Sequence, residues 1–269
     1  MNYADQIFKQ NLKEILNEEF EIDNRAKWKD GTQVYTKRII SVVNKYDLSK
    51  EFPAITLRPI GIKSVFKELD WIYRKQSNNI NDLGLKIWDS WADENGSVGK
   101  TYGYQISKPV FGYDNQIDYI LGEIQKNPTS RRLVVEMWNV NELSEMNLPP
   151  CYHNLQFLVK NGKLHLILKQ RSLDMITAGN WDVVLHALLV HMIARHCNLE
   201  VGTLTHIIGD MHIYNKHIDQ AYEMLNRKSL EAPKFWLNPE VKNFYDFTES
   251  DVKLAYKEKH PQLKFEVAI

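Results

Sequence analysis

One stretch of the chain, residues 182–197, is apolar almost all round when it is wound into a helix. Its apolar residues are Val183, Val184, Leu185, Ala187, Leu188, Leu189, Val190, Met192, Ile193 and Ala194. A helix without a polar face is buried rather than laid on a surface. Its N-terminus, with Asp182 as the expected cap, therefore opens inside the protein, near whatever the surrounding sheet carries.

Other periodic segments indicate what surrounds this helix. Apolar residues at helical spacing predict helices over residues 3–20, 62–76, 116–126 and 215–225. Strands are indicated by an apolar run within residues 130–138 and by residues 153–169, which the hairpin motif Asn161-Gly162 interrupts. The segment after Ala232 is polar, aromatic and irregular. This order predicts an α+β fold with helices packed on a large, mostly continuous sheet.

The composition is that of an ordinary globular protein. Of the 269 residues, 43% are hydrophobic and 25% are charged, and no Ser/Gly/Pro-rich run marks a linker. We therefore expect a single domain over residues 1–269. Lys plus Arg equals Asp plus Glu at 34 each, so no overall positive field would attract nucleic acid or an anionic membrane. A small anionic ligand would have to be held by a few local arginines.

The two cysteines, Cys151 and Cys197, are too few for a disulfide framework and do not form a Cys-x-x-Cys pair. A reducing compartment follows as the expectation. Residues 1–20 carry charges along an amphipathic helical pattern, which is typical neither of a secretory signal nor of a membrane span. We expect a cytoplasmic protein with no membrane segment.

The residues around Cys151 raise the possibility of nucleophilic chemistry. A free cysteine is more often a small buried hydrophobe than a nucleophile. However, Ser130-Arg131-Arg132 and Gln170-Arg171-Ser172 each place arginine beside a hydroxyl, a pairing that binds phosphate through charge-assisted hydrogen bonds. An arginine near the thiol would also favour the reactive thiolate. Taken alone, each arginine is more often a solvated charge or an ion-pair partner.

A second polar motif is Gly209-Asp210-Met211-His212-Ile213-Tyr214. On a strand, His212 and Tyr214 would point to the same side, because they are two residues apart. They would form either a binding pair or a satisfied polar corner of the core. No metal is expected, because no His-x-x-x-His motif carries a glutamate and the five-residue step from His186 to His191 does not stack the two rings on one helix face.

Taken together, the motifs resemble the thymidylate synthase superfamily in order and in spacing. The matching segments are Lys67-Glu68-Leu69, Ile87-Trp88-Asp89-Ser90-Trp91, Tyr102-Gly103, Ser130-Arg131-Arg132, Leu148-Pro149-Pro150-Cys151, Gln170-Arg171-Ser172-Leu173-Asp174, Ala187-Leu188-Leu189, Gly209-Asp210-Met211-His212-Ile213-Tyr214 and Val267-Ala268-Ile269. They cover nearly the whole chain. The resemblance implies a thymidylate synthase-like homodimer.

The resemblance also implies a covalent one-carbon transfer with 5,10-methylenetetrahydrofolate as co-substrate. Cys151 would add to C6 of a pyrimidine nucleoside monophosphate and make C5 nucleophilic. Glu68 would organise water and proton transfers around the ring. Tyr102 and the Asp210 region would support the nucleophile and the base. Neither a metal nor a nicotinamide is needed for this reaction.

Binding roles follow from the same resemblance. Arg25, Arg171 and Ser172 would hold the 5′-phosphate, together with Arg131 and Arg132 donated across the dimer interface. His212 and Tyr214 would bind the sugar hydroxyl. The residues that would contact the folate are Trp88, Trp91, Asp174 and the C-terminal Ile269.

The chain departs from the family at residues 177–182, where thymidylate synthases carry a Leu-Gly-x-Pro-Phe-Asn type of sequence. Position 182 is Asp instead of the Asn whose amide reads O4 and N3–H of uracil. Cytosine presents the reverse pattern, an amino donor at C4 and an acceptor at N3. A carboxylate accepts from the amino group, and a proton shared with N3 would complete the pair and stabilise charge on the ring. We therefore expect a cytidylate substrate, CMP or dCMP, with Asp182 as a catalytic and base-reading residue. The alternative is that Asp182 is only a helix cap.

The fate of the one-carbon unit has several possible outcomes. Asp at position 182 resembles the (deoxy)cytidylate 5-hydroxymethylase branch of the superfamily, so 5-hydroxymethylation is the expected reaction. Trp88, Trp91 and the C-terminal tail instead resemble the synthases, whose tail excludes water. Thymidylate synthase activity on dUMP and reductive methylation of dCMP are therefore the alternatives. A non-catalytic nucleotide- or RNA-binding regulator is disfavoured by the zero net charge and by the intact set of Cys151, Glu68, Arg171 and His212.

Overall fold

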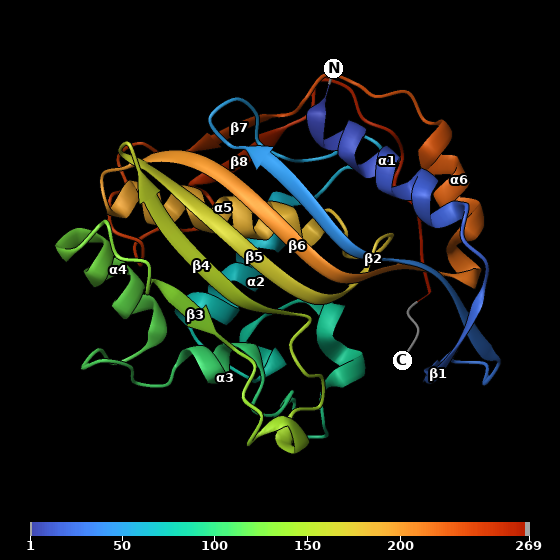
Figure 1. The fold of residues 1–269 in the computed structure, drawn as a ribbon, viewed down its shortest axis with the longest axis horizontal. Helices are drawn as coiled ribbons and strands as arrows, with labels where there is room; N and C mark the ends of the chain where they lie inside the picture. The colour runs from blue at the N-terminus through green and yellow to red at the C-terminus, as the bar shows by residue number, and fades with distance from the viewer. Residues whose placement is uncertain (1, 267–269) are drawn as a thin grey trace.

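A mixed β-sheet organises the chain (Figure 1). The computed structural model describes residues 2–266. The six-stranded sheet has the order β1-β2-β6-β5-β4-β3. Its strands are β1 (Glu21–Lys27), β2 (Gln33–Asp47), β3 (Val134–Glu136), β4 (Tyr152–Lys160), β5 (Lys163–Asp174) and β6 (Glu200–Tyr214). Neighbouring strands pair antiparallel except β5 and β6, which are parallel and therefore need a crossover connection.

The helices are α1 (Tyr3–Leu16), α2 (Ile62–Leu69), α3 (Tyr102–Ile106), α4 (Gln116–Lys126), α5 (Trp181–His196) and α6 (Ile218–Asn226). The first predicted helix ends earlier than expected, at Leu16, because the polar run that follows it leads into β1. The second helix continues from α2 into a π-helical turn, Asp70–Arg74. Short 3₁₀ helices are Ile80–Asp82, Lys86–Trp91, Leu143–Glu145 and Asn215–His217, the last of which precedes α6.

The predicted hairpin at Asn161-Gly162 is confirmed. Asn161 and Gly162 have φ values of 52° and 72°, the left-handed conformation that a two-residue turn between antiparallel strands requires. The strands on either side are longer than the predicted segment. Most of the predicted strand over residues 130–138 is irregular, and only Val134–Glu136 pairs with β4.

Three strands were not predicted as strands of this length: β1, β2 and most of β6. Charged and polar residues interrupt the apolar alternation of β2, because one side of that strand is exposed along much of its length. The segment after Ala232, expected to be irregular, also contains the two-stranded sheet of β7 (Lys234–Leu237) and β8 (Val252–Ala255). The α+β class and the continuous sheet are confirmed.

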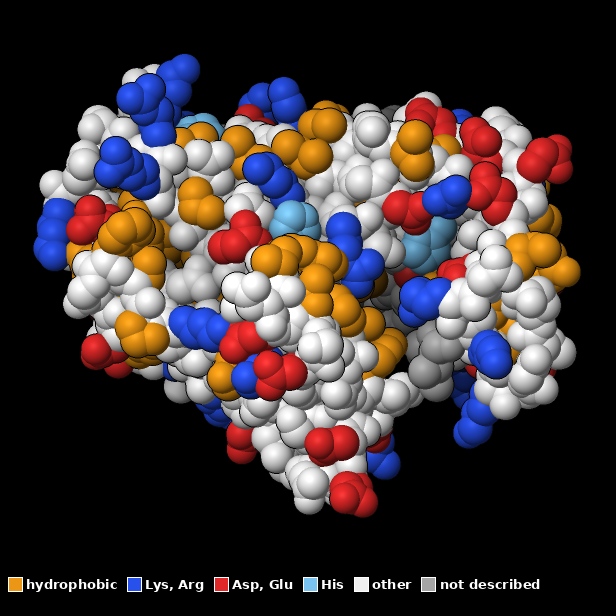
Figure 2. Space-filling model, turned by 60° about the horizontal axis from the view of Figure 1, so that its bottom comes forward, with side chains coloured by type: hydrophobic (Ala, Val, Ile, Leu, Met, Phe, Trp, Pro, Cys, Tyr) orange, Lys and Arg blue, Asp and Glu red, His pale blue; other side chains and the backbone are white. Residues whose placement is uncertain are grey.

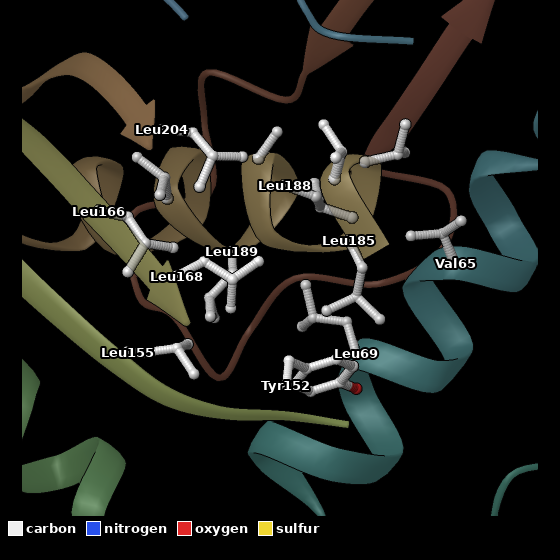
Figure 3. Close-up of a cluster of buried hydrophobic side chains, with 14 of the residues drawn as sticks. Val65, Leu69, Tyr152, Leu155, Leu166, Leu168, Leu185, Leu188, Leu189 and Leu204 are labelled. Atoms are coloured by element: carbon white, nitrogen blue, oxygen red, sulfur yellow. The ribbon is translucent and has the colours of Figure 1, made fainter. Parts of the chain in front are cut away.

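Helix α5 is the centre of the core and supplies the crossover between β5 and β6. Figure 3 shows Leu185, Leu188 and Leu189 of this helix among side chains from β4, β5, β6 and α2. All three are fully buried, as the absence of a polar face predicted. Truncating one of them to Ala would cost about 2–5 kcal/mol of unfolding free energy. Burial on this scale fixes the N-terminus of α5 relative to the strand ends.

Asp182 is not the cap of α5, so the helix-cap interpretation is wrong. Asn180 occupies the N-cap position, and its side chain accepts a hydrogen bond from Ile55 N and donates one to the carbonyl oxygen of Pro53. The helix begins at Trp181, and Asp182 is the second residue within it. Its carboxylate is buried and accepts a hydrogen bond from Gln170 at 2.8 Å. The side chain is therefore free of any capping role.

The two faces of the sheet differ. In Figure 1, α5 and α2 lie behind β4, β5 and β6, while the front face of these strands carries no helix. Ile40 and Val43 of β2 are 70% and 54% exposed, which leaves large apolar side chains uncovered along the sheet. Within residues 2–266, no helix is long and apolar enough to cross a membrane.

Candidate active site

A cavity of about 890 Å³ opens where β5 and β6 end and α5 begins. Figure 2 shows the molecule hollowed next to a band of hydrophobic side chains, with Lys and Arg side chains beside the hollow. The residues expected from the sequence that line the cavity are Arg25, Glu68, Trp88, Trp91, Tyr102, Cys151, Arg171, Ser172, Asp174, Asp182, His212 and Tyr214. Arg131 and Arg132 do not line it, and Ile269 lies outside the described residues. One site therefore unites segments from most of the chain.

Cys151 lies at the start of β4 and is fixed by two neighbours. Its backbone N–H donates to the hydroxyl oxygen of Tyr102 at 2.7 Å. A guanidinium nitrogen of Arg171 lies 4.0 Å from its Sγ atom. Tyr102 itself has a φ of 31°, a conformation that a residue with a side chain adopts only when its surroundings enforce it. The thiol is thus held at a defined point on the cavity wall.

The pKa of the Cys151 thiol reflects two opposing effects. Burial raises it above its usual value, and the charge of Arg171 counteracts this rise. Asp182 raises it further by like-charge repulsion. The expectation that arginine favours the thiolate is correct in direction, but burial outweighs it. A proton acceptor close to Sγ would therefore have to assist thiolate formation.

Glu68 lies at the end of α2 and is almost fully buried. Trp88 Nε1 donates to one of its carboxyl oxygens at 2.7 Å, and Trp181 Nε1 donates to the other. Burial raises the pKa of the carboxyl, while the two indole donors lower it. A buried carboxyl that lines the cavity and is held by two donors is suited to binding and releasing a proton during a reaction.

Asp182 provides a second buried carboxyl in the same cavity. Burial raises its pKa to about 7, and the hydrogen bond from Gln170 opposes that rise. The negative charges of Glu68 and Asp174 add to it. Near neutral pH, the group is therefore divided between its neutral and ionised forms. A neutral carboxyl both donates and accepts a hydrogen bond, whereas the ionised form only accepts.

His212 and Tyr214 lie on the same side of β6, as the two-residue spacing predicted, and their rings are 4.9 Å apart. The Nδ1 atom of His212 lies 2.7 Å from a carboxylate oxygen of Asp210. The other Asp210 oxygen accepts from Arg38 at 3.1 Å. His212 Nε2 is buried and has no partner among the described residues. This nitrogen is available to a hydroxyl group of a ligand in the cavity.

The four arginines expected at the site differ from one another in their surroundings. Arg171 donates from its guanidinium to the carbonyl oxygens of Pro149 and Pro150, at 2.8 and 3.0 Å, which keeps it beside Cys151. Arg25 is 69% exposed on β1 and lies 3.9 Å from Asp23. Arg131 and Arg132 are exposed between α4 and β3, away from this cavity. Within one chain, the arginines that line the cavity are therefore Arg25, Arg58 and Arg171.

Aromatic side chains form part of the cavity wall. Trp88 contacts both Trp91 and Tyr102 edge to face, with ring centroids 5.6 and 5.3 Å apart. Asp174 accepts hydrogen bonds from the backbone of Ile176 and from Thr177, so its carboxylate also stabilises the turn after β5. An aromatic wall and a cavity of this volume suit a flat heterocyclic ligand.

Sequence reasoning missed several residues of this site. Trp181 binds Glu68, Gln170 binds Asp182, and the buried Arg58 donates to the carbonyl oxygen of Thr177. Gln170 and Trp181 are the sequence neighbours of Arg171 and Asp182, and roles were predicted only for the latter two. Arg58 stands beside Pro59 in no recognisable motif. Among residues 2–266 there is no group of three or more His, Cys, Asp or Glu side chains placed to hold a metal ion.

Comparison with known proteins agrees with this geometry. The family described as thymidylate synthase matches residues 6–269. Thymidylate synthase 1 of Bacillus subtilis (strain 168) is 40% identical over 280 residues, which cover 100% of both chains. The thymidylate synthase of Bacillus phage phi3T is 38% identical, again over 100% of both chains. The structure of thermostable thymidylate synthase A from Bacillus subtilis superposes with a TM-score of 0.92 at 39% identity, covering 98% of this chain and 99% of that one. The chain therefore belongs to the thymidylate synthase family.

Proposed function

We propose that this member of the family, a one-carbon transferase acting on a pyrimidine nucleotide, carries out reductive methylation at C5 of dUMP through Cys151. Full-length relatives named thymidylate synthase favour this reaction over the hydroxymethylation expected from the sequence. The observation that carries the proposal is the position of Cys151, between the guanidinium of Arg171 and the hydroxyl of Tyr102, in a cavity with a buried carboxyl. The nucleophile, the anion-binding group and the proton carrier therefore line the same cavity.

The residues suggest how the covalent step proceeds. Sγ of Cys151 forms a bond to C6 of the ring, and the electron pair of the C5–C6 double bond moves toward C5 and the C4 substituent. Asp182 and water bound near Glu68 supply hydrogen bonds where that negative charge develops. Arg171 stabilises the thiolate while holding the phosphate. When bound, 5,10-methylenetetrahydrofolate would supply both the one-carbon unit that C5 attacks and the hydride that reduces it to a methyl group, leaving as dihydrofolate, and Trp88 and Trp91 would offer its ring system a contact surface.

Asp182 favours a second candidate substrate, a cytidylate. An ionised carboxylate faces O4 of uracil without a proton between them, a mismatch that costs about 1–3 kcal/mol when buried. It accepts readily from the amino group of cytosine. The neutral carboxyl, however, serves both bases: it donates to O4 and accepts from N3–H of uracil, or donates to N3 and accepts from the amino group of cytosine. Since burial brings the pKa to about 7, both nucleotides have a physical basis at this site.

One experiment distinguishes these candidates. Purified protein is incubated with 5,10-methylenetetrahydrofolate and each of dUMP, dCMP and CMP, with products identified by mass spectrometry and dihydrofolate followed by absorbance. Methylated dUMP with stoichiometric dihydrofolate is the expected result. A cytidylate that gains a methyl group with dihydrofolate would establish the second candidate. A hydroxymethylated product without dihydrofolate would restore the hydroxymethylase interpretation, and turnover of none of the three would refute the proposal.

We also propose that two copies of the chain complete each site, with Arg131 and Arg132 supplied by the partner. Support comes from their exposure outside the chain's own cavity and from the apolar sheet face that carries no helix. Mixing the inactive Cys151→Ala protein with the Arg131→Ala/Arg132→Ala protein tests this arrangement. After subunit exchange, random pairing restores about a quarter of the native sites. If the mixture stays inactive while heterodimers form, the arginines do not cross.

The free thiol that this mechanism needs also supports a reducing location. Both Cys151 and Cys197 are unpaired in the structure. An oxidised Cys151 could not add to a pyrimidine ring. We therefore keep the cytoplasm as the proposed place of action.

A further inference from the structure

A chain of buried hydrogen bonds extends from Asp182 away from the cavity. Gln170 Nε2 donates to Asp182 Oδ2 at 2.8 Å, and Gln170 Oε1 lies 2.8 Å from Nε2 of His206. Gln170 is 3% exposed and His206 is fully buried. His206 lies on β6 and does not line the cavity, so it contacts the site only through Gln170.

The direction of these bonds is fixed by a third contact. Gln170 Nε2 also donates to the backbone carbonyl of Ser172 at 3.0 Å, and a carbonyl oxygen can only accept. The amide nitrogen of Gln170 must therefore face Ser172 and Asp182, and its oxygen must face His206. That oxygen also only accepts, so His206 must carry its proton on Nε2. Burial lowers the pKa of His206 to about 3, which leaves the ring neutral with a single N–H.

The Nε2–H tautomer of His206 costs free energy that packing of the core alone would not impose. Nδ1 of His206 is buried and has no hydrogen-bond partner among residues 2–266, whereas an apolar ring at the same place would leave no acceptor unsatisfied. The main chain of Asp182 is held separately. His186 Nδ1 lies 2.7 Å from the Asp182 carbonyl oxygen, and the hydroxyl of Tyr73 lies 2.9 Å from His186 Nε2. The contact from His206 therefore adds control of the Asp182 side chain rather than of its backbone.

The consequence concerns which oxygen of Asp182 reads the base. Because Oδ2 receives an N–H from Gln170, the proton of a neutral Asp182 belongs on Oδ1. If Gln170 were free to turn over, its oxygen could accept a proton from Oδ2, and Oδ1 would become only an acceptor. The two arrangements present different hydrogen-bonding patterns to the same ring. Uracil and cytosine differ in this pattern at C4 and N3.

We infer that His206, acting through Gln170, is a positioning residue that fixes the donor and acceptor oxygens of Asp182 and thereby sets the discrimination between uridylate and cytidylate. The inference rests on the proposed one-carbon transfer to a pyrimidine nucleotide at this site. It holds for either preferred base, because it concerns the ratio between the two nucleotides and not which of them is turned over faster.

The test compares His206→Phe with His206→Gln. Phenylalanine keeps an aromatic ring but removes the donor, whereas the amide nitrogen of glutamine can replace Nε2–H. The quantity measured is the ratio of kcat/KM for dUMP to that for dCMP, with methylenetetrahydrofolate saturating. We expect His206→Phe to shift this ratio at least tenfold toward equality and His206→Gln to keep it within about threefold of the wild type.

His191→Phe is the matched control. His191 is a partly buried imidazole on an aromatic contact, with Phe235 at 4.7 Å, but it has no hydrogen bond to Gln170 or Asp182. It should change thermal stability while leaving the base ratio unchanged. Equal loss of activity on both nucleotides in His206→Phe, or the same ratio shift in His191→Phe, would overturn the inference and leave His206 a structural residue.

A second measurement covers the case in which His206→Phe does not fold. The ¹⁵N NMR spectrum of the wild-type protein should show His206 as the Nε2–H tautomer at neutral pH, and the Nδ1–H tautomer would refute the proposed direction. If the wild type turns over neither nucleotide, the proposed function fails in that first assay. The ratio of dUMP to dCMP binding by calorimetry then replaces turnover in the same three variants, and binding of neither nucleotide removes the inference as well.

Discussion

The two ends of the cavity are built on opposite principles. At the end proposed to read the base, called the buried end below, Glu68 and Asp182 are buried carboxyls whose pKa values are raised by loss of solvent. At the end proposed to bind the phosphate, called the exposed end below, Arg25 is mostly exposed, and Arg131 and Arg132 lie outside the cavity of their own chain. Proton chemistry here depends on burial, which the core around α5 provides. Anion binding depends on charge, which exposed segments and a second chain can supply.

This difference predicts how the ends respond to substitution. Groups at the buried end are held by several contacts each, so a change there should affect the chemical step or the folding equilibrium. Side chains at the exposed end are mobile and surrounded by water, which screens their charges. A single charge there therefore contributes only modestly to ligand binding. Four substitutions test the contrast, beginning with the largest expected effect.

Cys151→Ala should lower kcat by about 10⁴-fold or more, because no other group can form the bond to C6. Nucleotide binding should remain close to that of the wild type, since Arg171 is held by the carbonyl oxygens of Pro149 and Pro150 and not by the thiol. Turnover, together with mass spectrometry of the adduct with a fluorinated pyrimidine nucleotide, measures both. Adduct formation in the variant would show that another residue is the nucleophile.

Glu68→Gln should lower kcat by roughly 10²- to 10⁴-fold, the range typical of removing a positioned proton carrier. The amide still fills the space between Trp88 and Trp181, so KM for the nucleotide should change little. The kcat and KM values are obtained from initial rates. A large rise in KM with normal kcat would instead assign Glu68 to ground-state binding.

Asp182→Asn should flatten the pH dependence of stability. The pKa of Asp182 is raised from 3.8 to about 7, so the folded state binds the proton more tightly than the unfolded state. Stability from this group is complete below about pH 4 and is lost as the pH rises to about 7. At about 1.4 kcal/mol per pKa unit, the loss is at most about 4 kcal/mol. Urea unfolding from pH 4 to pH 8 measures the difference between the variant and the wild type.

Asp251→Asn provides the control of opposite sign. Hydrogen bonds from Asn238 and Thr248 lower the pKa of Asp251, so its contribution is present at neutral pH and is lost as the pH falls below the ordinary range of a carboxyl. Replacing it should therefore reduce stability at neutral pH.

A pH profile for Asp182→Asn that parallels the wild type would mean that Asp182 is ionised throughout, and the buried end would then resemble the exposed one.

Arg25→Ala should have the smallest effect, roughly a tenfold rise in KM for the nucleotide with kcat unchanged, as expected for one exposed charge-assisted contact to a phosphate. The rise should shrink at high salt, because screening weakens the contact in the wild type. Lys27→Ala, an exposed cation on the same strand, is the control. A fall in kcat as large as that of Glu68→Gln would remove the distinction between the two ends.

Much of the site could be predicted because its residues lie in compact motifs. Gln170-Arg171-Ser172 and Met211-His212-Ile213-Tyr214 occupy consecutive positions on strands, and the alternation of strand residues places their functional members together. The strands β1 and β2 could not be predicted with their bounds, because exposure along one side breaks the apolar alternation. Arg58 and Trp181 were missed because their roles depend on partners distant in the chain, Thr177 and Glu68.

The sequence by itself determined the buried helix, the Asn161-Gly162 turn, the family and the identity of most groups that face the cavity. The helix and the turn follow from apolar periodicity and local conformational preference, whereas the family and the cavity-facing groups follow from the resemblance of the motifs in order and in spacing. Only the tertiary structure decided that Asp182 is not a cap, that burial raises the pKa of its carboxyl, and that Gln170 and His206 orient its oxygens. Burial and hydrogen-bond direction arise from contacts among β5, β6 and α5, and no single segment carries that information.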